Sequence, residues 1–125
     1  MLFDLDHFKA VNDQHRHHAG DQVLCRVADV IAATAGASRL TARMGGEEFA
    51  VLIVSPPTGA LAVRLWVALR EVEHPELTGQ RVTASLGIGE VTMGDGFESA
   101  YARVDTALYR AKRQGATGLS VRKLC

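Results

Sequence analysis

Cysteine is scarce in this chain, and its scarcity excludes several classes of protein. Among 125 residues there are only Cys25 and Cys125, whose number and spacing give neither a disulfide framework nor a cysteine-based metal site. Cys25 also falls inside an apolar helical pattern. We therefore expect a protein of a reducing compartment, the cytoplasm.

Long hydrophobic runs are missing as well. No segment approaches the roughly 20 apolar residues that a membrane-spanning helix needs. Asp4, Asp6 and Lys9 interrupt the start of the chain, where a signal peptide would be apolar. We expect no membrane segment in this chain, so any tether would come from an upstream region.

The chain has no net charge, because 14 basic residues balance 14 acidic ones. Without a bulk positive field, we expect no binding to nucleic acid, although a local nucleotide site is compatible with this balance. The 47% of hydrophobic and 22% of charged residues are typical of a folded globular protein. A chain of this length suits one domain, spanning 1–125.

What the sequence does contain is an alternation of strand-like and helix-like patterns. Apolar runs predict strands, and apolar residues three or four apart predict helices. The predicted strands are 1–5, 40–44, 49–54, 82–91 and 119–121, and the predicted helices are 7–12, 21–36, 61–72 and 97–111. We expect a polar loop over 13–20, a bend or bulge at Gly87 and Gly89, and helix ends at Gly36 and Gly115.

The resulting order is β-α-β-β-α-β-α-β. Strands separated by helices, with one adjacent hairpin, predict an α/β or α+β fold with one mixed sheet. We favour α+β, with a mixed central sheet flanked by helices. Its βαββαβ core is the ferredoxin-like arrangement, as in the palm domains of nucleotide cyclases and polymerases.

Two carboxylates stand out in this arrangement. Asp4 ends the first strand, and Glu47 follows the two glycines of the predicted hairpin, Gly45 and Gly46. The first strand and the hairpin are neighbours in a ferredoxin-like sheet, so the two acids can converge. Mg²⁺ prefers such oxygen ligands together with substrate phosphates. The alternative is that both acids are simply solvated at a strand end and a turn.

Five segments, in order and in register, resemble the GGDEF family of diguanylate cyclases. Gly45–Phe49 reads GGEEF, a variant of the loop that names the family. The others are Asp4–Asp13 (DxDxFKxxND), Ala19–Leu24 (GDxxL), Val82–Ile88 (VTxSxGI) and Asp105–Lys112 (ADxALYxAK). Together they cover nearly the whole chain.

The resemblance implies condensation of two GTP molecules into cyclic di-GMP with release of pyrophosphate. It implies Mg²⁺ (or Mn²⁺) held by Asp4, Glu47 and the Leu5 carbonyl. It assigns catalytic roles to Glu47 and Glu48. The residues implied to contact phosphate are Phe8, Lys9, Gly45, Gly46 and Lys112.

Asn12 and Asp21 match the positions that read guanine. A carboxylate accepts from both N1–H and the exocyclic amine of guanine, whereas adenine lacks this donor pair. The alternatives without a ligand are a first-turn acid at Asp21 and an exposed last-turn lysine at Lys112, each favoured by the helix dipole. The resemblance matches His17 to a histidine of the family's GHxxGD segment, and His15 and His18 are expected to be loop residues. None of the three is expected to have a dedicated metal role.

The sequence departs from the family in four places. The family's N-terminal helix and most of its first strand are not present before Asp4. Gly36 and Arg39 stand where an inhibitory RxxD site needs arginine and aspartate, so we expect no such site. Ala116 replaces an arginine that binds phosphate in the family, and Arg16 replaces a glycine near the nucleotide. Two alternatives stay open for Arg16: its bulk obstructs the nucleotide, or its charge replaces that of the lost arginine.

These features leave two main hypotheses. The first is an enzyme that works as a homodimer, with an upstream sensor or receiver domain outside this chain. The second is a GTP-binding or dimerisation module of low activity or none, suggested by Ala116, Arg16 and the missing N-terminal segment. A receptor that binds cyclic di-GMP through the inhibitory site is disfavoured by Gly36 and Arg39.

Overall fold

A computed structural model describes residues 1–36, 39–54, 58–114 and 119–121. Within them the chain runs β1 (Leu2–Leu5), α1 (Phe8–Gln14), α2 (His17–Ala35), β2 (Leu40–Gly45), β3 (Glu48–Leu52), α3 (Thr58–Glu71), a 3₁₀ turn η1 (Pro75–Leu77), β4 (Ala84–Ile88), α4 (Phe97–Arg113) and β5 (Leu119–Val121). The predicted order of strands and helices is confirmed, including the short helix predicted over 7–12, and the structure adds the 3₁₀ turn η1.

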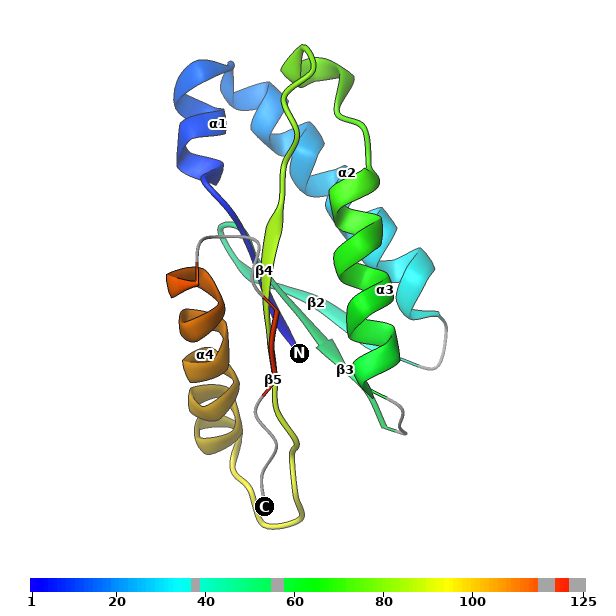
Figure 1. The fold of residues 1–125 in the computed structure, drawn as a ribbon, viewed down its shortest axis with the longest axis vertical. Coiled ribbons are helices and arrows are strands. Elements are labelled where there is room, and N and C mark those ends of the chain that lie inside the picture. The colour runs from blue at the N-terminus through cyan, green and yellow to red at the C-terminus, as the bar shows by residue number, and fades with distance from the viewer. Residues whose placement is uncertain (37–38, 55–57, 115–118, 122–125) are drawn as a thin grey trace.

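The strands of the described residues form a five-stranded sheet in the order β2-β3-β1-β4-β5 (Figure 1). The first four are antiparallel, and β5 runs parallel to β4 at the edge. This is the predicted ferredoxin-like core, extended by one parallel strand. Strand β1 lies in the middle because β3 and β4 pair with its two edges.

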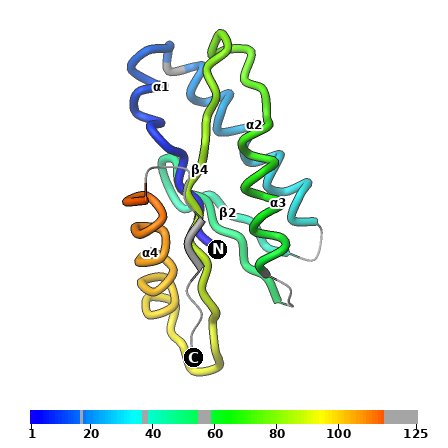
Figure 2. The backbone as a smooth tube through the Cα atoms, in the orientation of Figure 1, coloured from blue at the N-terminus to red at the C-terminus, as the bar shows by residue number. Residues whose placement is uncertain are grey.

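Helices cover both faces of the sheet. The backbone trace shows α4 on one side of β4 and α2 with α3 on the other (Figure 2). Alternate residues of a strand point to opposite faces. Accordingly Phe3 and Leu5 enter the larger core with α2 and α3, whereas Leu2 packs against Val104 and Leu108 of α4. The side of β1 that faces α4 is therefore the side on which Asp4 also lies.

Several predicted boundaries were wrong. The stretch 13–20 is not a loop, because α1 continues to Gln14 and α2 begins at His17. The strand predicted over 82–91 is only Ala84–Ile88. Gly36, by contrast, is the C-cap of α2, with a φ of 81°. Gly115 lies outside the described residues.

Gly87 is not at a bulge. It pairs regularly with Leu2 in the β1–β4 ladder. A Cβ at this position would lie 2.5 Å from the backbone nitrogen of Leu108 and 2.6 Å from the backbone oxygen of Val104. The glycine therefore permits close packing of α4 on β4, and the bulge instead lies between Arg43 and Gly45 of the hairpin.

None of the helices in the described part of the chain is long and apolar enough to cross a membrane.

Candidate active site

A pair of carboxylates lies on the α4 side of the sheet. Asp4 of β1 and Glu48 of β3 are direct partners in the antiparallel ladder. Like charges opposite each other destabilise a sheet, so this pair needs compensating groups. Two residues of α4 supply them: Lys112 Nζ lies 2.6 Å from Asp4 Oδ2, and the Tyr101 hydroxyl donates to Glu48 Oε1 at 2.6 Å.

The hairpin brings Glu47 to the same end of β1. The backbone oxygen of Glu47 accepts a hydrogen bond from the Leu5 amide at 3.2 Å. Gly46, with a φ of 49°, adopts the left-handed conformation that glycine takes without steric cost. Arg43 Nε donates to the Gly46 oxygen at 2.9 Å and fixes this turn. The hairpin thus places Glu47 and Glu48 at the end of β1 that carries Asp4.

Only one of the two carboxylate oxygens of Asp4 has a partner among the described residues. Its Oδ1 atom is buried and has no hydrogen-bond partner among the described residues. Burial raises the pKa of Asp4 above its ordinary value, Lys112 opposes this, and the charges of Glu47 and Glu48 add to it. A buried, unpaired carboxylate oxygen costs free energy unless a cation or donor reaches it.

The two residues predicted to read guanine come from neighbouring helices. A Cβ on Gly20 would overlap Asn12 Oδ1 and approach the Phe8 ring, so α2 crosses α1 closely at this glycine. The next residue, Asp21, is exposed on α2, and Asn12 is partly buried on α1. Because α2 begins at His17, Asp21 is not in its first turn, and the first-turn explanation for this acid is wrong.

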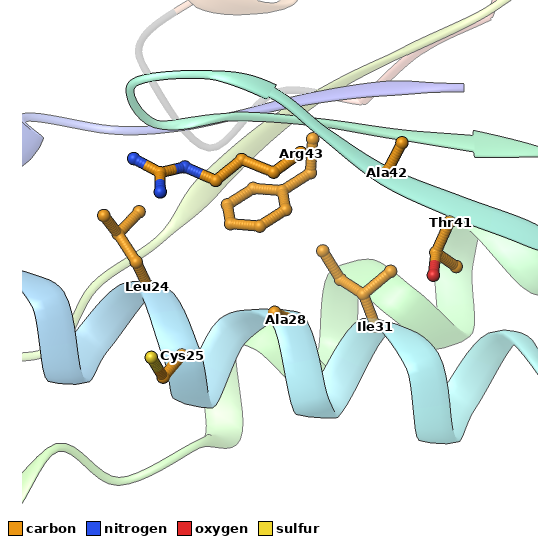
Figure 3. A pocket seen from close by; sticks show the side chains of 8 residues that line it. Leu24, Cys25, Ala28, Ile31, Thr41, Ala42 and Arg43 are labelled. Carbon is orange, nitrogen blue, oxygen red and sulfur yellow. The ribbon is translucent and has the colours of Figure 1, made fainter.

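A pocket of about 240 Å³ lies between α2 and the hairpin (Figure 3). Leu24, Cys25 and Ala28 line it from α2, and the Arg43 side chain extends along it toward Leu24. Asp21 precedes Leu24 and Cys25 by three and four residues, so it lies on the same helix face, one turn nearer the start of α2. Leu24 was predicted to be core or pocket wall, and it is both.

The residues predicted to contact phosphate differ in how exposed their side chains are. Lys9 is exposed on α1, and Gly45 and Gly46 are exposed at the hairpin. The Phe8 side chain is buried in the core, so only its backbone can reach a ligand. Lys112 lies in the last turn of α4, as expected for a lysine that only stabilises the helix end. It also forms the ion pair with Asp4.

Three polar residues near the site were missed from the sequence. Asp6 is buried and accepts from the Thr83 and Ser85 hydroxyls, both at 2.8 Å, which ties the end of β1 to β4. Tyr101 and Arg43 were also missed. Only Asp6 had a signal in the sequence, because it forms an acidic pair with Asp4 two residues earlier.

Comparisons with known proteins identify relatives of this chain. The family model described as "Diguanylate cyclase, GGDEF domain" matches residues 1–117. The chain is 39% identical over 125 residues to the probable diguanylate cyclase DgcF of Escherichia coli K12, covering 92% of this chain and 39% of that protein. The chain therefore spans well under half the length of this relative.

Solved structures give the same result for the fold. The active GGEEF domain of a diguanylate cyclase from Vibrio cholerae superposes with a TM-score of 0.86 at 31% identity, covering 99% of this chain and 81% of that one. The GGDEF domain of DgcB from Caulobacter crescentus, in complex with c-di-GMP, superposes with a TM-score of 0.85 at 33% identity. The match covers 96% of this chain and 74% of that one.

Proposed function

Because the chain belongs to the GGDEF family of diguanylate cyclase domains, we propose that it condenses two GTP molecules into cyclic di-GMP with release of two pyrophosphates. One observation carries the proposal. Asp4 and Glu48 are paired carboxylates at the sheet centre, Glu47 adjoins them, and Asp4 keeps a buried oxygen without a partner in the described residues. A purely structural sheet gains nothing from this cluster of acids.

The same acids fit Mg²⁺ or Mn²⁺. Within the described residues, no group of three or more His, Cys, Asp or Glu side chains is arranged to hold a metal ion. Mg²⁺ is commonly held by one or two carboxylates plus substrate phosphates, so an incomplete protein cage suits it. Asp4, Glu47 and the Leu5 carbonyl would hold the metal. When bound, divalent ions neutralise the triphosphate and favour in-line displacement.

The chain's own residues have separate tasks in the reaction. Lys112, Lys9 and the backbone amides of Gly45 and Gly46 would bind phosphate oxygens. Glu47 would accept the proton of the 3′-hydroxyl. The bond from that oxygen to the α-phosphorus forms while the bond to pyrophosphate breaks, and the proton then passes to solvent.

Asn12 and Asp21 would select guanine. Asp21 would accept from N1–H and the exocyclic amine, and the partly buried Asn12 would bind the other side of the base edge. Adenine would leave the Asp21 carboxylate without its donor pair, which favours GTP over ATP.

Turnover requires two copies of the domain. The 3′-hydroxyl of each GTP must attack the α-phosphate of the other, and each copy holds one GTP. We therefore propose a homodimer as the active form. An upstream sensor or receiver domain would bring the two copies together, and isolated protein should show concentration-dependent activity.

Product inhibition through an RxxD site should be absent. Gly36 offers no side chain at the arginine position. Arg39 stands at the aspartate position, and its Nη1 atom donates to the Ala35 backbone oxygen at 2.7 Å, at the end of α2. An arginine held there cannot replace an acidic residue in binding the product's guanine. Calorimetric titration with cyclic di-GMP should detect no binding at this position.

A second candidate is a GTP-binding or dimerisation module with little turnover. Arg16 favours it, because this exposed, bulky residue is the N-cap of α2, the helix that carries the predicted base-reading residue Asp21 five positions later. Ala116, which lacks an arginine's grip on phosphate, also favours it but lies outside the described residues.

Product analysis separates the two candidates. Concentrated protein is incubated with GTP and Mg²⁺, beside a Glu47→Gln variant. Cyclic di-GMP from the parent and none from the variant would support the cyclase. Absence of product, together with thermal stabilisation by a non-hydrolysable GTP analogue, would support the binding module. Neither product nor stabilisation would contradict both.

A further inference from the structure

The hydroxyl of Tyr101 connects α4 to the hairpin formed by β2 and β3. It donates to Glu48 Oε1 at 2.6 Å, across 53 positions of sequence. The Tyr101 ring packs against the cluster of Leu2, Val104 and Leu108, and its centroid lies 5.8 Å from that of Phe97. The ring therefore packs against apolar neighbours, which limits the positions open to the hydroxyl donor.

Tyr101 remains a donor over the whole working pH range. The hydrogen bond to Glu48, with burial as a smaller cause, raises the pKa of Tyr101 to about 12. A phenol in this state donates one hydrogen bond to one carboxylate oxygen. A carboxylate has about four acceptor positions on its two oxygens, so Glu48 keeps its other oxygen for a ligand.

Each carboxylate of the pair has its own donor on α4. Lys112 pairs with Asp4, and Tyr101 pairs with Glu48, although Asp4 and Glu48 are direct neighbours across the ladder. Without the hydroxyl, Glu48 would keep its like-charge repulsion by Asp4 but lose the donor that offsets it. Its carboxylate would then no longer have a fixed position against α4.

We propose that Tyr101 is a positioning residue for Glu48, which it holds against α4 so that the charge of this carboxylate keeps one fixed place beside Asp4 and Glu47, the residues that would hold the metal. The inference rests on the proposed function, since it assigns Tyr101 a task in that reaction. Tyr101 does not touch the reacting atoms and acts only through Glu48.

The expected effect follows from partners of this kind in other metal sites. Removing a residue that orients a ligand typically lowers metal affinity or activity by about 10–100-fold. For Tyr101→Phe we expect kcat to fall about 10-fold and the Mn²⁺ dissociation constant to rise about 10-fold. The KM for GTP at saturating metal should change by less than about twofold, because Asn12 and Asp21 bind the base elsewhere.

The experiment compares Tyr101→Phe with Tyr109→Phe. Phenylalanine keeps the ring packing, so thermal unfolding should show both variants folded. Tyr109 is on the same helix but 61% exposed, which makes it a matched control. Mn²⁺ binding is followed by electron paramagnetic resonance with a non-hydrolysable GTP analogue, and cyclic di-GMP formation is measured separately.

A double-mutant cycle tests whether Tyr101 acts through Glu48. Adding Tyr101→Phe to Glu48→Gln should cost no more than Glu48→Gln alone. The inference would be overturned if Tyr101→Phe lowered activity by the same factor in the parent and in Glu48→Gln. Unchanged kcat and Mn²⁺ affinity in Tyr101→Phe would also overturn it. If the parent chain makes no product but binds Mn²⁺ and the analogue, the proposed cyclase fails while the Mn²⁺ comparison still decides the role of Tyr101. If it binds neither, both fail.

Discussion

Lys112 Nζ and Asp4 Oδ2 lie 2.6 Å apart, and this contact joins the last turn of α4 to the end of the central strand β1. The other oxygen of the same carboxylate, Oδ1, is buried without a partner in the described residues. Asp4 is thus poised between a lysine on one side and a position that a metal ion can fill on the other. In the proposed reaction, Lys112 would turn from Asp4 to a phosphate once a metal bound the carboxylate.

Replacing Lys112 by methionine should therefore weaken triphosphate binding more than it weakens the fold. The lysine side chain is 37% exposed, so solvent screens the ion pair and its loss should cost no more than about 1 kcal/mol of stability. We expect the KM for GTP to rise by about 10-fold, equivalent to about 1.4 kcal/mol. Steady-state kinetics and thermal unfolding measure the two effects. Arg113→Gln, an exposed change one residue later, is the control, and an equal rise in KM there would contradict the assignment.

Asp21→Asn should reduce the preference for guanine. An amide can donate as well as accept, so it no longer matches the two adjacent donors of the base. We expect discrimination between GTP and ATP analogues to fall by about 10-fold or more. Calorimetric binding in Mg²⁺ measures it. Asp29→Asn changes an exposed acid farther along α2 and should leave both affinities unaltered.

Stability should decline on mild acidification because of His74. Its side chain is fully buried, with Nδ1 3.4 Å from Arg26 Nη1 and 3.6 Å from Glu76 Oε1. Burial lowers the pKa of His74 below 6.5; Arg26 acts in the same direction and Glu76 opposes it. Below pH 6.5 the unfolded chain therefore binds a proton that the folded chain resists, and the free energy of unfolding decreases.

Unfolding temperatures between pH 7.5 and pH 5.5 test this effect. The decline should be smaller in His74→Gln than in the parent, once each is compared with its own value at pH 7.5. His18→Gln alters an exposed histidine and should keep the full decline. A parent and a His74→Gln variant with parallel pH profiles would contradict the role of His74.

Gly87→Ala should destabilise the fold by about 1–3 kcal/mol or more, because the new methyl group would meet the backbone of α4 at Val104 and Leu108. Gly59→Ala makes the same chemical change near the start of α3, where no atom lies within 4 Å of the new Cβ. For Gly59→Ala we expect the free energy of unfolding to rise by up to about 1 kcal/mol, since alanine favours a helix over glycine. Chemical denaturation measures both, and losses of equal size would refute the packing argument.

Much of the fold followed from periodicity. Strand and helix order depend on local apolar spacing, and the stripe from Phe97 to Ala111 predicted α4 closely. Boundaries were less predictable around 13–20, where polar residues looked like a loop. The structure has two helices there, because Phe8 and Val11 bury one face of α1 and Gly20 lets α2 pack against Asn12.

The sequence by itself determined the family, the order of the elements and the acids that end β1 and begin β3, since these depend on residue type and spacing. Only the tertiary structure decided which partners those acids have. Tyr101 and Lys112 lie far from Asp4 and Glu48 in sequence, and they meet only because α4 packs closely on β4 at Gly87. Such contacts depend on the crossing of a helix over a sheet, which no local pattern specifies.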